Sequence, residues 1–156
     1  MITIAETKDA RLVAAMNEWV QQLHHQLHPD VFKPYDKDEA VSAFTNMLAG
    51  PDCRAFIALQ NNTPVGYAIF MIKEVNESPF RFKGRSLYID QLAVLEEYRS
   101  RGVGKLLLTQ AETLAKELGA NMVELDYWTA NIVAASFFHK NGFAVYRQIL
   151  SKAIDK

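Results

Sequence analysis

The stretch from Ser86 to Lys105 constrains the fold of this chain more than any other. Its first part, Ser86–Val94, is rich in apolar and β-favouring side chains and predicts a strand. The segment Leu106–Leu118 carries apolar residues at helical spacing and predicts a helix. Between them lies a short basic loop that contains Gly102 and Gly104. The sequence therefore predicts a unit of strand, glycine loop and helix.

This loop has the features of a phosphate-binding site. Glycine has no Cβ atom, so the backbone N–H groups around Gly102 and Gly104 can come close to a ligand. The first N–H groups of the following helix have no partner within the helix, and the helix dipole adds partial positive charge there. Helix ends of this kind bind phosphate groups. The side chains of Arg99, Arg101 and Lys105 add formal positive charge around the loop.

Two common phosphate-binding motifs do not describe the loop. A P-loop needs Ser or Thr after its lysine, but Leu106 follows Lys105. The dinucleotide-binding fingerprint needs a glycine three residues after its second glycine, but Leu107 takes that place. The loop therefore belongs to another class.

The pattern Arg99-x-x-Gly102-x-Gly104 after a strand resembles the acetyl-CoA pyrophosphate loop of the GNAT superfamily, the Gcn5-related N-acetyltransferases. The flanking Glu97-Tyr98 and Leu92-Ala93-Val94 are also similar to that family. The resemblance implies that acetyl-CoA is bound here, with its pantetheine arm along the strand. The residues implied to bind it are Leu92, Ala93, Val94, Arg99, Ser100, Arg101, Gly102, Val103, Gly104 and Lys105.

The segment Asn131–Phe143 resembles the second signature of the same family, an Asn followed by an Ala, an aromatic pair and Gly-Phe. The resemblance implies that Asn131 contacts the cofactor and that the helix with Phe138 lies along it. Asn131 also suits an ordinary N-cap, and both roles can hold at once. Phe138 stands where many members have a tyrosine that protonates the departing CoA thiolate, and phenylalanine has no proton to give.

Another source of that proton is therefore expected. A thiol has a pKa of about 8.5 and leaves tolerably without help, so water could protonate the thiolate. The side chains of Tyr127, Tyr146 and His139 are alternatives by their nearness in sequence, and each could instead be structural. We take Tyr127 as the candidate catalytic acid.

The resemblance implies transfer of an acetyl group from acetyl-CoA to a primary amine by direct attack in a ternary complex. An amine of the lysine type has a pKa of about 10, so a base must remove a proton before attack. Asp90 is the candidate base, because it is a carboxylate within an otherwise apolar strand. The alternative is that Asp90 faces solvent or pairs with Arg85 or Lys83. In the family a backbone N–H of the central strand binds the oxyanion, here in the region of Leu92-Ala93-Val94.

The acceptor amine is not identified by the sequence. Glu124 and Asp126 share one face of the next expected strand, so they could assist the base through water, bind the acceptor's charge, or only form a polar face. By resemblance, the segment 29–35 and the loop with Phe80 and Phe82 would line the acceptor site. Many members of the family pair as dimers, so a homodimer is an expected assembly. Two other functions stay open: a GNAT-fold module that binds acyl-CoA without catalysis, and a nucleotide-binding enzyme.

Periodicity along the rest of the chain predicts an α/β fold with a mixed sheet covered by helices, in the order β-α-α-β-β-β-α-β-α-β. GNAT domains have the same order. Thr7 is expected to cap the first helix, and Asp36 the second. Residues 74–84 are expected to form a loop. The expected strands are 1–5, 53–59, 65–72, 86–94, 122–127 and 143–151. The expected helices are one after the Thr7 cap with apolar positions over 12–27, one after the Asp36 cap with apolar positions over 41–48, and two over 106–118 and 131–140.

The composition limits the class of protein. A chain of 156 residues is expected to form one domain, 1–156, and its net charge of −1 gives no sign of nucleic acid or an anionic membrane as a partner. The single cysteine, Cys53, excludes an intrachain disulfide and fits a reducing compartment, so a cytoplasmic location is expected. No apolar run of membrane length and no signal peptide is visible. His24 and His28 have a zinc-like spacing, but no HExxH motif or nearby carboxylate supports it, so we expect no metal.

Overall fold

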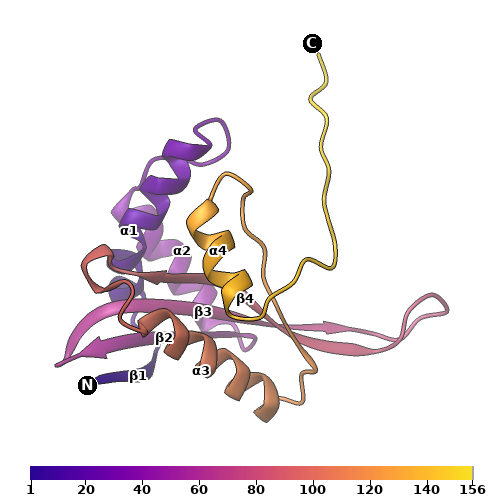
Figure 1. Ribbon diagram of the computed structural model, residues 1–156, viewed down its shortest axis with the longest axis horizontal. Helices are drawn as coiled ribbons and strands as arrows, with labels where there is room; N and C mark the ends of the chain where they lie inside the picture. Colours follow the sequence, from indigo (N-terminus) through magenta and orange to yellow (C-terminus); the bar gives the residue numbers. More distant parts are fainter. Residues whose placement is uncertain (156) are drawn as a thin grey trace. The chain divides into compact units, whose positions relative to one another are not determined.

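The computed structural model describes residues 1–155 and divides into two compact units, which are described separately (Figure 1). The first unit, residues 1–126, holds the sheet, and the second begins at Tyr127. No helix among the described residues has the length and apolar character that crossing a membrane requires. The elements of the first unit are β1 (Ile2–Thr7), α1 (Ala10–Leu27), α2 (Lys37–Ala49), β2 (Cys53–Gln60), β3 (Thr63–Val75), β4 (Gly84–Val94), the short 3-10 helix η1 (Glu96–Tyr98), α3 (Val103–Glu117) and β5 (Met122–Glu124).

The five strands form one sheet in the order β1-β2-β3-β4-β5. Neighbouring strands from β1 to β4 run antiparallel, whereas β5 runs parallel to β4. This confirms the mixed α/β sheet expected from the sequence. β4 lies between β3 and β5, so the strand that carries the expected base is flanked on both sides.

Two hairpins join the middle strands. The turn between β2 and β3 is formed by Asn61 and Asn62, whose φ angles of 50° and 65° lie in the left-handed region that asparagine tolerates. The sequence predicts a loop over 74–84, but the pairing of β3 with β4 continues to Val75 and Gly84. Figure 1 shows this second hairpin reaching beyond the rest of the sheet. The expected loop is thus only its tip.

Helices cover the sheet on both faces. Alternate residues of β3 point to opposite faces, and Tyr67 and Ile69 share a buried cluster with Val13 of α1 and Phe44 of α2. Phe70, the residue after Ile69, is also fully buried and belongs to the other face. α3 packs against β3 and β4 (Figure 1). The core therefore lies in two layers with β3 and β4 at their centre.

The expected cap of α1, Thr7, is wrong, and Asp9 caps the helix. The Asp9 carboxylate accepts hydrogen bonds from the backbone N–H groups of Arg11 and Leu12, at 3.0 and 3.1 Å. Thr7 ends β1, and its hydroxyl accepts a hydrogen bond from the Asp9 N–H at 3.1 Å. The expected cap of α2 is confirmed, because Asp36 accepts a hydrogen bond from a first-turn N–H at 2.9 Å.

α3 and β5 differ from the expected ranges in length. α3 begins at Val103, three residues earlier than expected, so Gly104 and Lys105 belong to its first turn. The reason is that Gly102, with φ of +84°, makes the left-handed turn into the helix and serves as its N-cap. β5 ends at Glu124 rather than at residue 127, because its pairing with β4 ends there.

The second unit contains α4 (Ile132–Lys140), close to the expected range. Asn131 is its N-cap, since its side-chain oxygen accepts a hydrogen bond from the Ala134 N–H at 3.1 Å. The expected strand at 143–151 is wrong: the described chain after Gly142 forms neither helix nor strand (Figure 1). Apolar side chains suited to a strand are present, but residues 143–151 take part in no β ladder among the described residues.

Candidate active site

Asp90 lies at a β-bulge in β4. Ile69 of β3 pairs with Gln91, and the next residue, Phe70, pairs with Ile89, so Asp90 is the extra residue of β4. A bulge interrupts the alternation of side chains and often redirects one of them beside an active site. Gln91 therefore keeps the face of Ile69, towards α1, while Asp90 is exposed to solvent. The sequence indicates a carboxylate in an apolar strand but not the bulge.

The surroundings of Asp90 raise the pKa of its carboxyl group. Shielding from solvent is the largest cause, even though the residue is exposed, and the charge of Asp126 adds to it. A hydrogen bond from Gln91 and the charge of Lys73 act in the opposite direction. The Gln91 Nε2 group donates to Asp90 Oδ2 at 3.4 Å. Raised pKa values of this kind are typical of general bases.

The partners considered for Asp90 from the sequence do not bind it. Arg85 forms an ion pair with Glu74 and also donates to the backbone oxygen of Leu118 at 2.6 Å. Within residues 1–155, Lys83 forms no ion pair with Asp90. Of the alternatives to a catalytic role, only exposure to solvent agrees with the structure.

Tyr88 and Asp126 form a hydrogen-bonded pair next to Asp90. The Tyr88 hydroxyl donates to Asp126 Oδ2 at 2.6 Å, and the Lys73 ammonium lies 3.7 Å from the centre of the Tyr88 ring. Burial, followed by the hydrogen bond to Asp126, raises the pKa of Tyr88. The Asp126 carboxylate thus already accepts a hydrogen bond from the Tyr88 hydroxyl. Tyr88 was not among the residues predicted from the sequence, although its place two residues before Asp90 in the strand indicates a nearby side chain.

The far half of β4 has an open backbone edge. β5 pairs with β4 only from Ser86 to Tyr88, so the strands separate beyond that point. The Leu95 N–H donates to Val65 on the β3 side at 2.9 Å, and backbone groups alternate between the two edges of a strand. The backbone N–H groups of Leu92 and Val94 therefore point to the open edge. This is the arrangement expected for binding a pantetheine arm and an oxyanion at these residues.

The glycine loop and the start of α3 suit an anionic ligand. Ser100 and Gly102 have φ angles of +60° and +84°, which turn the chain into the helix. No side chain caps α3 in the described structure, so the N–H groups of its first turn, at Val103, Gly104 and Lys105, are presented without a capping acceptor. A Cβ atom placed on Gly102 would meet nothing within 4 Å, which leaves room beside the loop. The residues present therefore fit a bound diphosphate.

The two arginines of the loop contact the protein itself. Arg99 donates through Nε to the Val94 oxygen at 3.2 Å, and its guanidinium lies 4.5 Å from the centre of the Trp19 ring. The guanidinium of Arg101 lies 5.4 Å from the centre of the Tyr98 ring. Arg99 thus links the loop to β4 and α1, a structural role that the sequence does not reveal.

Tyr127 and His139 form a hydrogen-bonded pair in the second unit. His139 Nδ1 lies 3.0 Å from the Phe143 carbonyl oxygen, and a carbonyl can only accept, so Nδ1 carries the proton. In the neutral ring Nε2 then accepts the hydrogen bond from the Tyr127 hydroxyl, at 2.7 Å. Two of the three candidate proton donors are therefore joined. The third, Tyr146, is 66% exposed.

Phe138 is the buried residue of α4, 8% exposed. Its ring makes edge-to-face contacts with Phe137 and Phe143, at centroid distances of 5.2 and 5.6 Å. Phe138 thus holds α4 to the turn that follows it. Asn131 uses its side-chain oxygen as the helix cap, and its predicted contact with the cofactor stays a prediction.

The histidines of α1 pack against the loop that follows the helix. The His24 ring stacks on Phe32 with 4.8 Å between centroids, and His25 Nδ1 lies 2.7 Å from the Phe32 oxygen. Burial, with the charge of His28, lowers the pKa of His24. The described residues contain no group of three or more side chains placed to hold a metal ion. The histidines thus contact the segment 29–35, and its role at the acceptor site stays a prediction from the resemblance.

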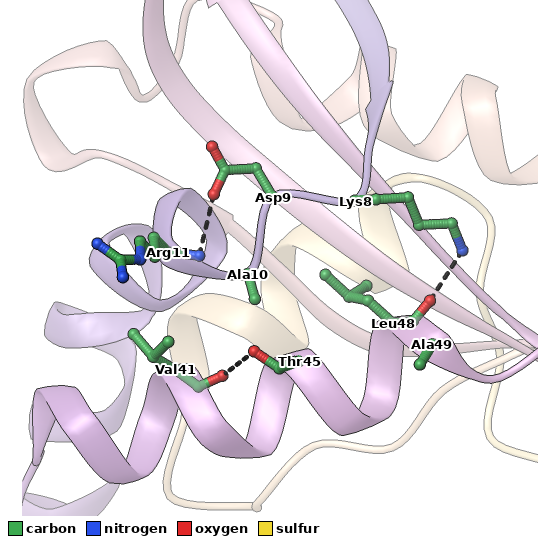
Figure 2. A pocket seen from close by; sticks show the side chains of 8 residues that line it. All are labelled: Lys8, Asp9, Ala10, Arg11, Val41, Thr45, Leu48 and Ala49. Carbon is green, nitrogen blue, oxygen red and sulfur yellow. Dashed lines mark hydrogen bonds between the residues drawn. The ribbon is translucent and has the colours of Figure 1, made fainter.

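A pocket lies between the start of α1 and α2, and none of the predicted site residues lines it (Figure 2). Its polar groups are used locally: Lys8 Nζ donates to the Leu48 oxygen at 2.9 Å, and Thr45 donates to the Val41 oxygen at 2.7 Å. The Asp9 carboxylate at its rim caps α1. We assign no chemistry to this pocket. Its lining residues are Lys8, Asp9, Ala10, Arg11, Val41, Thr45, Leu48 and Ala49.

Comparison with solved structures supports the fold. A mutant of BH1408 protein from Bacillus halodurans superposes with a TM-score of 0.89 and 21% identity over 99% of both chains. A predicted acetyltransferase from Clostridium acetobutylicum, solved with acetyl-CoA, superposes with a TM-score of 0.73 and 20% identity over 98% of this chain and 96% of its own. At these identities the likeness establishes the fold alone.

Sequence comparison identifies the family. The chain is 26% identical over 140 residues to N-alpha-acetyltransferase 30 of Schizosaccharomyces pombe, covering 88% of this chain and 86% of that protein. It spans only about half the length of two other relatives that it matches, 54% and 52%. The family model described as acetyltransferase (GNAT) matches residues 14–143. Since that match takes in β4, the glycine loop and α4 together, the chain belongs to the acetyltransferase (GNAT) family.

Proposed function

We propose that the chain is an acetyl-CoA-dependent N-acetyltransferase that acts on a primary amine. The observation that carries the proposal is the course of β4: a carboxylate at a bulge, then an open backbone edge, then an uncapped helix N-terminus. A base, an oxyanion donor and a diphosphate site thus follow one another along a short stretch of chain. This is the set of groups that acetyl transfer from a thioester requires.

The donor substrate, acetyl-CoA, supplies a thioester. The N–H groups at the start of α3, with Ser100 and Arg101 beside them, would bind its diphosphate. The open edge at Leu92 and Val94 would bind the pantetheine arm. The contacts of Asn131 and Phe138 with the cofactor stay predictions from the resemblance. Arg99 would hold the loop in place, since its guanidinium already contacts Val94 and Trp19.

The reaction then proceeds by direct attack. Asp90 accepts a proton from the acceptor ammonium, and the amine nitrogen forms a bond with the thioester carbon. A backbone N–H at the open edge of β4 stabilises the oxyanion, and the carbon–sulfur bond breaks as it collapses. Tyr127 donates its proton to the thiolate, in place of the tyrosine that Phe138 replaces. His139 Nε2 accepts from the same hydroxyl and carries no proton in this tautomer, so the hydroxyl turns from His139 to the thiolate and the phenolate left behind takes a proton from water.

The test is release of CoA, followed with a thiol reagent, across a panel of peptides, polyamines and aminoglycosides. Asp90→Asn should lower kcat/KM by roughly 100-fold at neutral pH and recover partly at high pH, where the amine loses its proton unaided. Asp52→Asn, which removes an exposed carboxylate at the start of β2, is the matched control and should behave as wild type. A wild-type pH profile for Asp90→Asn would remove Asp90 as the base.

One observation favours a second function, an acyl-CoA-binding module without catalysis: Phe138 has no proton to donate. Tight binding of CoA with no turnover on any amine of the panel would support it. The homodimer, the cytoplasmic location and the single domain stay predictions from the sequence.

A further inference from the structure

A polar cluster lies in the core between α1 and the sheet, and one of its members is the chain neighbour of Asp90. It consists of Asn17 of α1, Tyr67 of β3 and Gln91 of β4, and the first two are 7% and 0% exposed. Asn17 is the one buried polar or charged residue within the described chain. Buried polar groups are costly unless each is hydrogen-bonded, so the cluster needs an explanation beyond core packing.

The donors and acceptors of the cluster fix the orientation of the Gln91 side chain. Tyr67 donates its hydroxyl proton to Gln91 Oε1 at 2.6 Å, and Asn17 Nδ2 donates to the same oxygen at 3.2 Å. Asn17 Nδ2 also donates to the Tyr67 oxygen at 3.1 Å. With the Gln91 amide alone reversed, its NH2 group would face the NH2 group of Asn17, and the Tyr67 proton would lose its acceptor. With both amides reversed, Gln91 Oε1 would face the Asp90 carboxylate, and neither group could donate to the other.

The result of this orientation is that the Gln91 Nε2 group faces Asp90. It can only donate, and it lies 3.4 Å from Asp90 Oδ2. The bulge makes this contact possible, because it interrupts the alternation of side chains at two successive residues. Gln91 contacts Tyr67 and Asn17, and Asp90 is exposed to solvent.

We propose that Gln91, held by Tyr67 and Asn17, is the positioning residue for Asp90: it holds one carboxylate oxygen in place, leaving the other oxygen to accept the acceptor's proton. The proposal rests on the function proposed above, in which Asp90 is the base. In this interpretation, the buried cluster holds the Gln91 side chain so that its Nε2 N–H points at the Asp90 carboxylate.

Several other groups act on the Asp90 carboxylate and stay in place when Gln91 is changed. Lys73 of β3 favours its charged form, and Asp126 after β5 disfavours it. Tyr88, Tyr67 and Cys53 interact with its charge from β4, β3 and β2. Since the Gln91 hydrogen bond lowers the pKa of Asp90, its loss should raise that pKa.

The test measures the titration of the Asp90 carboxyl group directly, by carbon-detected NMR on the full chain, without an acceptor. In Gln91→Met, which keeps the side-chain length and loses the donor, the midpoint should move up by roughly 0.5 to 1 pH unit. Tyr67→Phe, which loses the proton that holds Gln91 Oε1, should move it in the same direction by less. Tyr35→Phe is the control, because the Tyr35 hydroxyl donates to the Ala14 oxygen of α1 at 2.8 Å and not to Gln91, so the midpoint should stay.

An unchanged Asp90 midpoint in both folded variants would overturn the proposal. Where an active acceptor is found, the acid limb of kcat/KM should shift with the same sign and size, because protonated Asp90 cannot act as a base. If Asp90→Asn leaves that limb unchanged while Gln91→Met moves the NMR midpoint, the contact exists but Asp90 is not the base, and the proposed function fails rather than the hydrogen bond.

Discussion

The two halves of β4 show how one strand can serve both structure and chemistry. The first half, Ser86–Tyr88, is paired with β3 on one side and β5 on the other, and its Leu87 is fully buried. The second half, from Gln91 to Val94, follows the bulge at Asp90 and is paired with β3 alone. Completed pairing satisfies every backbone group internally, whereas an open edge leaves backbone groups for a ligand. The comparison assigns stability to the first half and binding to the second.

The largest expected effect tests the binding role, at the helix N-terminus that follows the open half. Gly104→Asp places a carboxylate in the first turn of α3, where the diphosphate is proposed to bind, and should lower CoA affinity by roughly 1,000-fold through charge repulsion. An acidic residue suits a helix N-terminus, so folding should be unharmed. The measurement is CoA binding by calorimetry.

Gly104→Ala is the matched control for this change. It adds a Cβ atom without charge, so it should lower CoA affinity only by the part that the ligand's close approach to Gly104 supplies, far less than Gly104→Asp does. Equal CoA affinity for wild type and Gly104→Asp would contradict a diphosphate site at this loop. The assignment of cofactor binding to the second half of β4 would then lose its support.

The second effect tests the structural half. Leu87→Ala removes a side chain that is fully buried, and should lower the free energy of unfolding by about 3 kcal/mol through lost burial and a residual cavity. Because Leu87 lies before the bulge, CoA affinity of the folded variant should be near wild type. Urea denaturation followed by circular dichroism measures the loss. A folded Leu87→Ala protein that fails to bind CoA would show that the two halves are not independent.

The same comparison separates what the sequence predicts from what it does not. The apolar run of β4, the glycine loop and the α3 pattern depend on local spacing, and these were predicted with small errors at the ends. The bulge depends on how β3 pairs with β4, which is a contact between distant segments. The Gln91 contact depends in turn on the bulge and on Asn17 of α1, so no local pattern reveals it.

The predicted strand at the end of the chain is wrong for a related reason. Residues 143–151 have a composition typical of a strand, but a strand exists only where another strand pairs with it. The sequence supplies the propensity and not the partner. The Thr7 cap was wrong on a smaller scale, since Thr7 is used by β1 and Asp9 is the next residue able to accept from the first turn.

The smallest expected effect concerns the stability that the folded protein loses when the Asp90 carboxyl group ionises. The pKa of Asp90 is raised in the folded protein, so the unfolded chain loses this proton at lower pH than the folded one. The free energy of unfolding of the wild type therefore falls as the pH rises from about 4 through the folded pKa, and this loss is complete at pH 7. Asp90→Asn cannot ionise, so its Tm should exceed the wild-type Tm by about 1 to 2 °C at pH 7, with the gain vanishing near pH 4.

The control for this change is Asp90→Glu, which keeps a carboxylate and should keep the pH dependence of the wild type. Scanning calorimetry across this pH range gives the comparison. A Tm difference of the opposite sign would mean that Lys73 and Gln91 outweigh the shielding of the carboxyl group, and the charge at the bulge would then stabilise the fold. In that case Asp90 would belong with the structural half of β4, and the division of the strand at the bulge would have to be abandoned.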